Sequence, residues 1–167
     1  MNIKNLIYAL TALSFTVVIG GAIYEHLAVV PIWTAAPPRS LAMFQGEYGL
    51  HPEMFWMPIH PVTLVLFVVT LILSWKSARR RNVLISFIGY VVLLAITAIY
   101  FVPELMAITR TAYANTIDAS LTERAATWEM LSLVRLAILI GLSLTLFLGL
   151  TKTSDPKNQP KTSDIVS

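Results

Sequence analysis

Four long apolar segments alternate with shorter polar ones along the chain. Residues 5–24, 54–75 and 82–103 carry no formal charge, and each run is close to the roughly 20 residues that a helix needs to cross about 30 Å of hydrocarbon. A fourth run, residues 136–151, approaches that length if Arg135 lies inside the membrane and faces protein or snorkels to the interface. Lipid cannot satisfy unpaired backbone groups, and the runs lack the alternation of barrel strands, so all four are predicted to be helices.

This pattern predicts an all-α fold, a four-helix transmembrane bundle that occupies residues 1–151. The expected spans are approximately residues 5–30, 58–75, 82–103 and 131–151. A long first outer loop, from about Pro31 to Pro58, is rich in proline and glycine, which is typical of turns. Residues 152–167 have little apolar surface to bury, so they are expected to form a disordered cytoplasmic tail.

Two short sequences suggest where helices begin and end. Residues 120–123 read Ser-Leu-Thr-Glu, a capping box that predicts a helix start near Leu121, about three turns before the last span enters the membrane. Pro103 is predicted to kink or end the third helix just before Glu104, because proline lacks a backbone N–H and clashes with the preceding turn.

Composition agrees with lipid as the solvent. Hydrophobic residues make up 56% of the 167 residues and charged residues only 13%, which is too apolar for a surface covered by water. The first apolar segment is longer than the core of a signal peptide, so we expect it to be retained as a span. The absence of cysteine excludes disulfides, thiol redox chemistry and thiolate metal sites.

The charges are divided between the two ends of the predicted bundle. The basic residues that flank the spans fall on one side: Lys4, Lys76, Arg79, Arg80, Arg81, Lys152, Lys157 and Lys161. The positive-inside rule therefore predicts that both termini are cytoplasmic, as expected for a protein of a bacterial inner membrane. The net charge of +3 follows from this topology, so the expected partner is the lipid bilayer and not a nucleic acid.

The opposite, outer side holds most of the acidic residues and all three histidines, His26, His51 and His60. Tryptophans also lie near that boundary and are expected to be interfacial: Trp33, Trp56 and Trp128. Any chemistry is therefore expected at this end.

Polar side chains recur on one face of each span. His60, Thr63, Thr70 and Ser74 follow helical spacing around Phe67, so this stripe should face the interior of the bundle. Tyr90, Thr97 and Glu104 are each seven residues apart on the third span. All four spans thus bring polar groups to a similar depth near the outer side.

These positions define a predicted polar pocket that is open to the outside. Its candidate catalytic residues are Glu25, His60, Glu104 and Arg135, and its candidate substrate-pocket residues are Tyr24, His26, Tyr100, Trp128 and Ser132. Glu25 and Arg135 have matching depths and are candidates for an ion pair. The alternative is structural: this pair locks the first and last helices together, and the other groups lie at the headgroup level.

A metal site is a more specific hypothesis for the same pocket. The candidate ligands for zinc or non-haem iron are His26, His60, Glu25 and Glu104. The chain contains no Glu-x-x-His or His-x-x-x-His pair, so the pattern of di-iron bundles is absent. We therefore expect no cofactor, with zinc or non-haem iron as the alternative.

The Gly20-Gly21 turn that leads to Pro31, and Trp128 followed by Arg135, resemble the DUF1772, or anthrone-oxygenase-like, family of small four-helix membrane proteins. The resemblance covers the layout of residues 5–150. It implies a cofactor-independent oxidation of a hydrophobic aromatic molecule that enters from the membrane. A base such as His60 or Glu25 would then remove a proton, and Arg135 would stabilise the resulting anion.

Two other functions fit the same residues. In a proton-coupled small-molecule transporter, Glu25 would exchange a proton for a lipophilic cation, although a paired Arg135 would hold Glu25 ionised. In a structural or accessory subunit, the small-residue face formed by Gly141, Thr145 and Gly149 would pack against a partner or a second copy of the chain.

Overall fold

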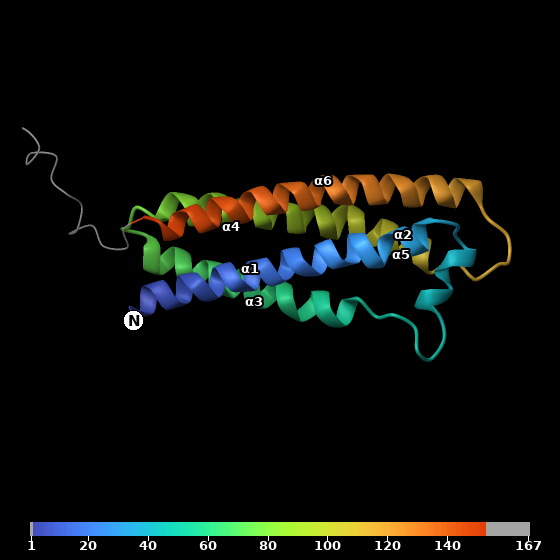
Figure 1. Ribbon diagram of the computed structural model, residues 1–167, viewed down its shortest axis with the longest axis horizontal. Coiled ribbons are helices and arrows are strands. Elements are labelled where there is room, and N and C mark those ends of the chain that lie inside the picture. The colour runs from blue at the N-terminus through green and yellow to red at the C-terminus, as the bar shows by residue number, and fades with distance from the viewer. Residues whose placement is uncertain (1, 153–167) are drawn as a thin grey trace, which may run out of the picture.

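The protein folds into a bundle of long helices. The first helix begins and the last helix ends at the same end of this bundle (Figure 1). The computed structural model describes residues 2–152. Its elements are α1 (Ile3–Ala28), α2 (Val30–Thr34), the 3-10 helix η1 (Arg39–Phe44), α3 (Glu53–Ser74), α4 (Arg80–Ile96), the π-helix η2 (Thr97–Phe101), α5 (Val102–Thr109) and α6 (Ala119–Leu150). The β pairing within residues 2–152 is an isolated bridge between Pro38 and Ile117.

Four continuous helical segments are long and apolar enough to cross a membrane. They are Ile3–Thr34, Glu53–Ser74, Arg80–Thr109 and Ala119–Leu150. The predicted all-helical class with four apolar spans is confirmed, and by length and composition the chain fits an integral membrane protein. All four segments are longer than the predicted spans, because the helices continue into the polar ends. The predicted tail lies outside the described residues, apart from Lys152.

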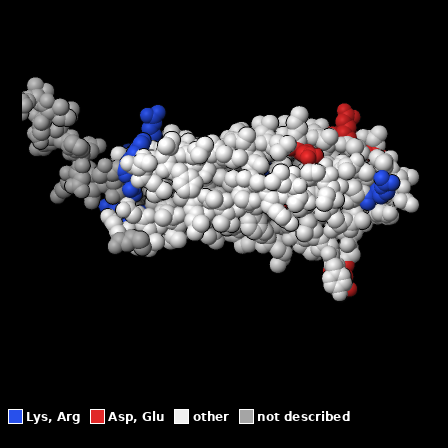
Figure 2. All heavy atoms as spheres, in the orientation of Figure 1, with Lys and Arg blue, Asp and Glu red and all other residues white. Residues whose placement is uncertain are grey.

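Figure 2 shows the distribution of charge along the bundle. Lys and Arg side chains gather at the end where α1 begins and α6 ends, acidic side chains lie towards the opposite end together with a further basic patch, and the belt between the two ends is almost free of charge. We call the first end the basic end and the second the cavity end. Such a belt is the surface that a hydrocarbon core requires.

The helices form a ring in which each has two neighbours. Helix α1 packs against α3 and α6, and α4 packs against the same two helices. Near the cavity end α5 packs against α6. Short connections place consecutive spans side by side, whereas the long loop between α2 and α3 caps the cavity end.

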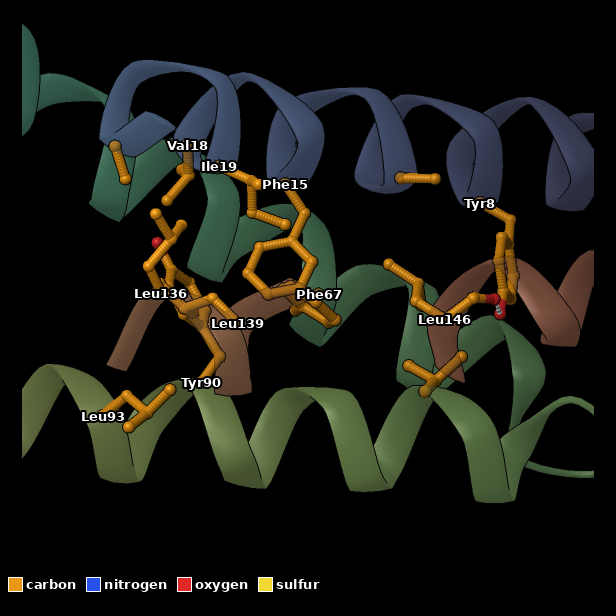
Figure 3. Packing of buried hydrophobic residues seen from close by; sticks show 13 residues of the cluster. Tyr8, Phe15, Val18, Ile19, Phe67, Tyr90, Leu93, Leu136, Leu139 and Leu146 are labelled. Carbon is orange, nitrogen blue, oxygen red and sulfur yellow. Dashed lines mark hydrogen bonds between the residues drawn. The ribbon is translucent and has the colours of Figure 1, made fainter. Parts of the chain in front are cut away.

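A hydrophobic cluster with aromatic rings at its centre packs between the four long helices (Figure 3). The ring of Phe15 meets those of Phe67 and Tyr90 edge-on, with centroids 5.3 and 4.9 Å apart. Hydroxyl pairs join α1 to α3 on both sides of this cluster: Thr11 with Thr70 at 2.6 Å, and Ser14 with Thr63 at 2.7 Å. The predicted stripe on α3 is buried between Thr63 and Ser74, so these hydroxyls hold the helices together.

A second cluster forms at the cavity end and corrects the prediction of interfacial tryptophans. Trp33 and Trp128 are buried, with ring centroids 5.4 Å apart, and Phe101 packs edge-on against Trp128 at 5.9 Å. The indole N–H of Trp128 donates to the Phe101 carbonyl at 2.9 Å. The loop between α2 and α3 folds over these rings through Leu41, so the rings have no access to the headgroup layer.

The third span continues past Pro103, so the predicted end of the helix at this proline is wrong. A π turn at residues 97–101 precedes the proline, and the Val102 N–H donates to the Thr97 carbonyl. A π turn holds one residue more than an α turn, which rotates every following residue by roughly 100° about the helix axis. The helix absorbs the proline in this way and ends at Thr109.

The last helix begins slightly earlier than the capping box suggested. Asp118 is its N-cap, and its carboxylate accepts hydrogen bonds from the backbone N–H groups of Ser120 and Leu121 at 2.9 and 3.1 Å. A carboxylate is a strong N-cap because it also interacts favourably with the helix dipole.

At the basic end, Arg79 holds the C-terminal end of α6. The side chain is only 7% exposed. Its guanidinium donates to the carbonyl oxygens of Lys152 at 2.8 Å and Leu150 at 3.4 Å, and to the Asn5 side chain at 2.7 Å. These bonds satisfy carbonyl groups that the end of a helix leaves without partners.

The small-residue face of α6 is partly used inside the chain. A Cβ at Gly149 would collide with the Tyr8 hydroxyl, so this glycine packs against α1. A Cβ at Gly141 would meet nothing within 4 Å. The face predicted for a partner is therefore reduced to Gly141 and half-buried Thr145.

Candidate functional site

A cavity of about 710 Å³ lies at the cavity end of the bundle. All four membrane-spanning segments and the loop before α3 contribute to its wall, which is mainly apolar and aromatic. The polar or charged side chains that line it are Glu25, His26, His51, Glu53, His60, Tyr90, Thr97, Thr109, Arg110 and Arg135. A mostly apolar cavity with a few convergent polar groups is typical of a small-molecule site.

Glu25 enters the cavity from α1 and is held by a tryptophan of α3. The indole N–H of Trp56 donates to Glu25 Oε1 at 2.7 Å. Phe55 and Trp56 can approach because Gly21, one turn earlier on α1, has no side chain: a Cβ there would collide with the Phe55 ring. Gly21 thus brings α3 close enough for the indole to reach the carboxylate.

His60 lies between two aromatic side chains. Its ring stacks on Trp56, four residues earlier on α3, with centroids 5.3 Å apart and planes 19° apart. Its Nδ1 shares a hydrogen bond with the Tyr90 hydroxyl at 2.7 Å. These two contacts fix the orientation of the ring, and Nδ1 is engaged while the ring borders the cavity.

Arg135 enters from α6 and has only neutral partners among residues 2–152. Its guanidinium donates to the Thr97 hydroxyl at 3.0 Å and to the Ser132 hydroxyl at 2.8 Å, and it lies over the Phe101 ring at 4.1 Å. The predicted ion pair with Glu25 is not formed within the described chain, whose ion pairs are His51–Glu53 and Arg124–Glu104. Glu25 instead bonds Trp56, so the two opposite charges face the same cavity without touching.

His26 also lines the cavity and is buried, with 9% of its surface exposed. Its Nδ1 lies 2.8 Å from the Ala22 carbonyl, one turn earlier on α1. Its Nε2 is buried and has no hydrogen-bond partner within residues 2–152.

Glu104 does not reach the cavity, which corrects its assignment to the pocket. Its carboxylate accepts a hydrogen bond from Arg124 Nε at 2.7 Å on the outside of the bundle. The π turn between Thr97 and Phe101 causes this displacement, because it breaks the seven-residue spacing that would have aligned Glu104 with Thr97. Phe101 takes the inward position instead and is buried.

The predicted wall residues are divided between the cavity and its surroundings. Trp128 and His26 line the cavity. Ser132 is buried behind Arg135 and orients it. Tyr24 and Tyr100 do not line the cavity, and Tyr24 is 65% exposed on the outer surface of α1.

The four predicted metal ligands do not converge. Within residues 2–152 no group of three His, Asp or Glu side chains has the arrangement of a metal site. Glu104 faces away, and Glu25 and His60 are joined through Trp56, not to one another. The donor set therefore does not fit zinc or non-haem iron.

Several cavity residues are also exposed on the outer surface of the bundle. Met57 on α3 is 73% exposed, and Val102 and Met106 on α5 are 47% and 37% exposed. These exposed cavity residues of α3 and α5 are apolar, as expected of a surface that faces lipid.

The cavity therefore combines a cation with neutral partners, an imidazole held in place, and a carboxylate within an apolar enclosure. Comparison of the chain with models of known protein families, with curated proteins and with solved structures found no match. Such a cavity can bind an apolar molecule that carries an acidic group, because the imidazole can take a proton and the guanidinium can stabilise the anion.

Two residues of the site were not identified from the sequence, Trp56 as the partner of Glu25 and Phe101 as the ring beneath Arg135. The spacing of Trp56 and His60, four residues apart on one helix, was a usable signal, because such pairs are neighbours on a helix surface. Phe101 had no such signal, since its inward position depends on the π turn.

Proposed function

We propose that this protein binds a lipid-soluble aromatic molecule with an acidic hydrogen and oxidises it, with His60 as the general base and Arg135 as the group that stabilises the anion. The observation that carries the proposal is the guanidinium of Arg135, which faces the cavity with only hydroxyl and aromatic partners among the described residues. The reaction class follows from the resemblance to the anthrone-oxygenase-like family.

The energetics of Arg135 support an anionic ligand. An arginine inside a membrane costs about 2.5 to 3.5 kcal/mol on insertion scales, so such residues normally pair with an acid or face water. Arg124, on the same helix, is paired in this way with Glu104 at 2.7 Å. Arg135 keeps guanidinium N–H groups that Thr97 and Ser132 do not use, and an oxyanion could accept from them in a site of low dielectric.

His60 is suited to remove the proton. When its Nδ1–H donates to the Tyr90 hydroxyl at 2.7 Å, Nε2 is the unprotonated nitrogen, and the stacked Trp56 ring holds it in place. A positioned imidazole of this kind contributes roughly a hundredfold or more to proton transfer. Glu25 is the alternative base, with Oε1 held by Trp56 at 2.7 Å.

Exposed apolar residues in the cavity wall support a ligand that arrives through the lipid. Met57 on α3 and Met106 on α5 line the cavity and are also exposed on the outer surface, and methionine side chains adapt easily to a passing molecule. His51 and Glu53, which pair at 2.8 Å, line the same cavity at the start of α3.

The proposed oxidation uses dioxygen as the co-reactant. Loss of a proton from an activated methylene group gives a carbanion that transfers electrons to dioxygen; oxidation of the methylene to a carbonyl then consumes one dioxygen and releases one water. The residues of the chain supply the base and the stabilisation of the anion. The proton that His60 accepts returns to the leaving oxygen.

Transport is the less favoured alternative. The cavity ends at Tyr90 and Leu139, and the cluster around Phe15 and Phe67 fills the bundle beyond them. This packing supports a site that a ligand enters and leaves from one side of the membrane, without passing through the bundle. The positive-inside distribution supports cytoplasmic termini in a bacterial inner membrane, with the cavity at the outer side. A homo-oligomer could form through the Gly141 side of α6.

The proposal is tested with anthrone, a tricyclic ketone with an acidic methylene group, and the protein in lipid nanodiscs. Exchange of the methylene hydrogens with deuterated water, followed by NMR under argon, measures proton removal. Dioxygen uptake, followed with an electrode, measures oxidation. His60→Phe and Arg135→Met should each lower both rates by about a hundredfold, because each removes a group that acts on the anion.

Arg124→Met is the matched control. This variant removes an arginine of the same helix whose partner, Glu104, lies outside the cavity, so both rates should remain near the wild-type values. Empty nanodiscs give the spontaneous rates. The proposal would be overturned if the wild-type protein gave the same rates as empty nanodiscs. It would also be overturned if Arg135→Met gave the same rates as the wild type. Deuterium exchange without dioxygen uptake would support proton removal by the protein and contradict the proposed oxidation.

A further inference from the structure

His26 holds an unused acceptor inside the candidate site. The Ala22 carbonyl can only accept, so His26 Nδ1, 2.8 Å away, carries the hydrogen of that bond. In the neutral ring the other nitrogen, Nε2, is then an acceptor. Nε2 is buried and without a partner within residues 2–152. Leaving a buried acceptor unsatisfied costs about 1 to 3 kcal/mol, so an occupant that donates to it would be stabilised.

The walls of the cavity differ in hydrogen-bonding character. Helix α1 contributes two acceptor-bearing residues to the wall, Glu25 and His26, whereas α6 contributes the donors of Arg135. Nε2 of His26 has no exposed surface of its own, so a donor reaches it when neighbouring side chains of the wall move. A molecule between them is best matched when one end is an oxyanion and the other end carries an O–H or N–H group. A ligand with a single acidic group would accept hydrogen bonds from Arg135 on α6 but would offer no donor to His26.

We propose that His26 is a specificity-determining residue that accepts a hydrogen bond from a second, donating substituent of the ligand, so that the substrate class is an aromatic molecule that carries a hydroxyl in addition to its acidic group. This inference rests on the proposed function, because it assumes that Arg135 receives the acidic group. Leucine and methionine side chains make up much of the surrounding wall, and their rotamers can change to admit the hydroxyl.

The test compares two probes that differ in one hydrogen-bond donor. The first is a naphthalenediol whose hydroxyls lie at opposite ends of the ring system, and the second is its monomethyl ether. The methyl ether retains the acidic hydroxyl and the distal oxygen but cannot donate to His26. Equilibrium dialysis against nanodiscs with and without the protein corrects for partition of each probe into lipid.

The wild-type protein should bind the diol roughly three- to tenfold more tightly than the methyl ether, the range for one neutral hydrogen bond. His26→Phe keeps an aromatic ring without an acceptor, and the preference should disappear because binding of the diol weakens. Arg124→Met, which changes a side chain outside the cavity, should retain the preference. Equal affinities in the wild-type protein, or a preference that persists in His26→Phe, would overturn the role of His26.

NMR of the ring nitrogens in histidine-labelled wild-type protein tests the same contact without a substitution that might affect folding. The described chain has only His26, His51 and His60 to assign. The diol should shift the Nε2 resonance of His26, and the methyl ether should not. If both probes bind in an Arg135-dependent manner and neither shifts Nε2, the proposed function stands and the role of His26 fails. If neither probe binds, both fail.

Discussion

Two arginines lie at opposite ends of the bundle and differ in what their guanidinium groups contact. Arg79, at the basic end, bonds the carbonyl oxygens of Lys152 and Leu150 and the side chain of Asn5. Arg135, at the cavity end, bonds two hydroxyls and covers an aromatic ring. Neither guanidinium pairs with a carboxylate within the described residues. Two of the three acceptors of Arg79 are backbone carbonyls, whereas both acceptors of Arg135 are side-chain hydroxyls.

This difference separates a structural arginine from a candidate functional one. Carbonyl groups at the end of a helix need donors, so Arg79 completes the fold. The Thr97 hydroxyl does not need Arg135, because it also donates to the Leu93 carbonyl at 2.7 Å. The buried Ser132 hydroxyl has Arg135 as its partner among the described residues. Arg135 is therefore oriented by its neighbours and leaves donors for a ligand, which is the arrangement expected of a binding site.

The largest expected effect is on stability at the basic end. Arg79→Met removes the three hydrogen bonds of a buried guanidinium, two of them to carbonyl groups at the end of α6, and should lower the free energy of unfolding by about 3 kcal/mol. Arg135→Met should leave it unchanged or raise it, because an apolar side chain replaces a charge inside the membrane. Unfolding in mixed detergent micelles, followed by circular dichroism, measures both. A loss of stability in Arg135→Met as large as that in Arg79→Met would remove the distinction between the two arginines.

Substitution of two glycines of α6 tests how tightly the basic half is packed. A methyl group at Gly149 would collide with Tyr8, so Gly149→Ala should cost about 2 kcal/mol of unfolding free energy through overpacking. Gly141→Ala is the control, because its Cβ would meet nothing within 4 Å, and it should be neutral or stabilise by up to about 1 kcal/mol. Equal effects in the two variants would contradict this packing.

A smaller effect is expected from the hydroxyl that orients Arg135. Thr97→Val keeps the shape of the side chain and removes the acceptor, so affinity for the naphthalenediol should fall roughly three- to tenfold. Thr16→Val is the control: its hydroxyl also donates to the carbonyl four residues earlier, at 2.8 Å, but it lies outside the cavity. If both variants bind equally well, Thr97 does not position the guanidinium.

The smallest effect concerns the cap of α6 at the cavity end. The backbone N–H of Leu121 and the Ser120 side chain lower the pKa of Asp118 below its ordinary value. A carboxyl with a lowered folded-state pKa stabilises the protein above its unfolded pKa, and this contribution is lost as the pH falls through the folded-state pKa. Thermal unfolding of wild type and Asp118→Asn should therefore differ near neutral pH and converge under acidic conditions.

In Asp118→Asn the side chain can still cap the helix but cannot titrate. A constant difference between the two unfolding temperatures at all pH values would show that the charge of Asp118 does not contribute. Its fully exposed position keeps the expected shift small compared with the effects at Arg79 and Gly149.

The four apolar helices, the separation of charge between the ends, and the buried stripe from Thr63 to Ser74 could all be predicted from the sequence alone. Length, hydropathy and helical spacing are local properties, and lipid leaves a helix few alternatives. The inward position of Glu25, His60 and Arg135 followed from the same spacing.

Which of these side chains contact one another depends on how the helices pack. One extra residue in the π turn moved Glu104 to the surface and Phe101 under Arg135. Gly21 allowed α3 to approach α1, so that Trp56 and not Arg135 became the partner of Glu25. Depth along a helix can be counted from the sequence, but the rotation of a helix and its distance from a neighbour depend on the packing of all the others.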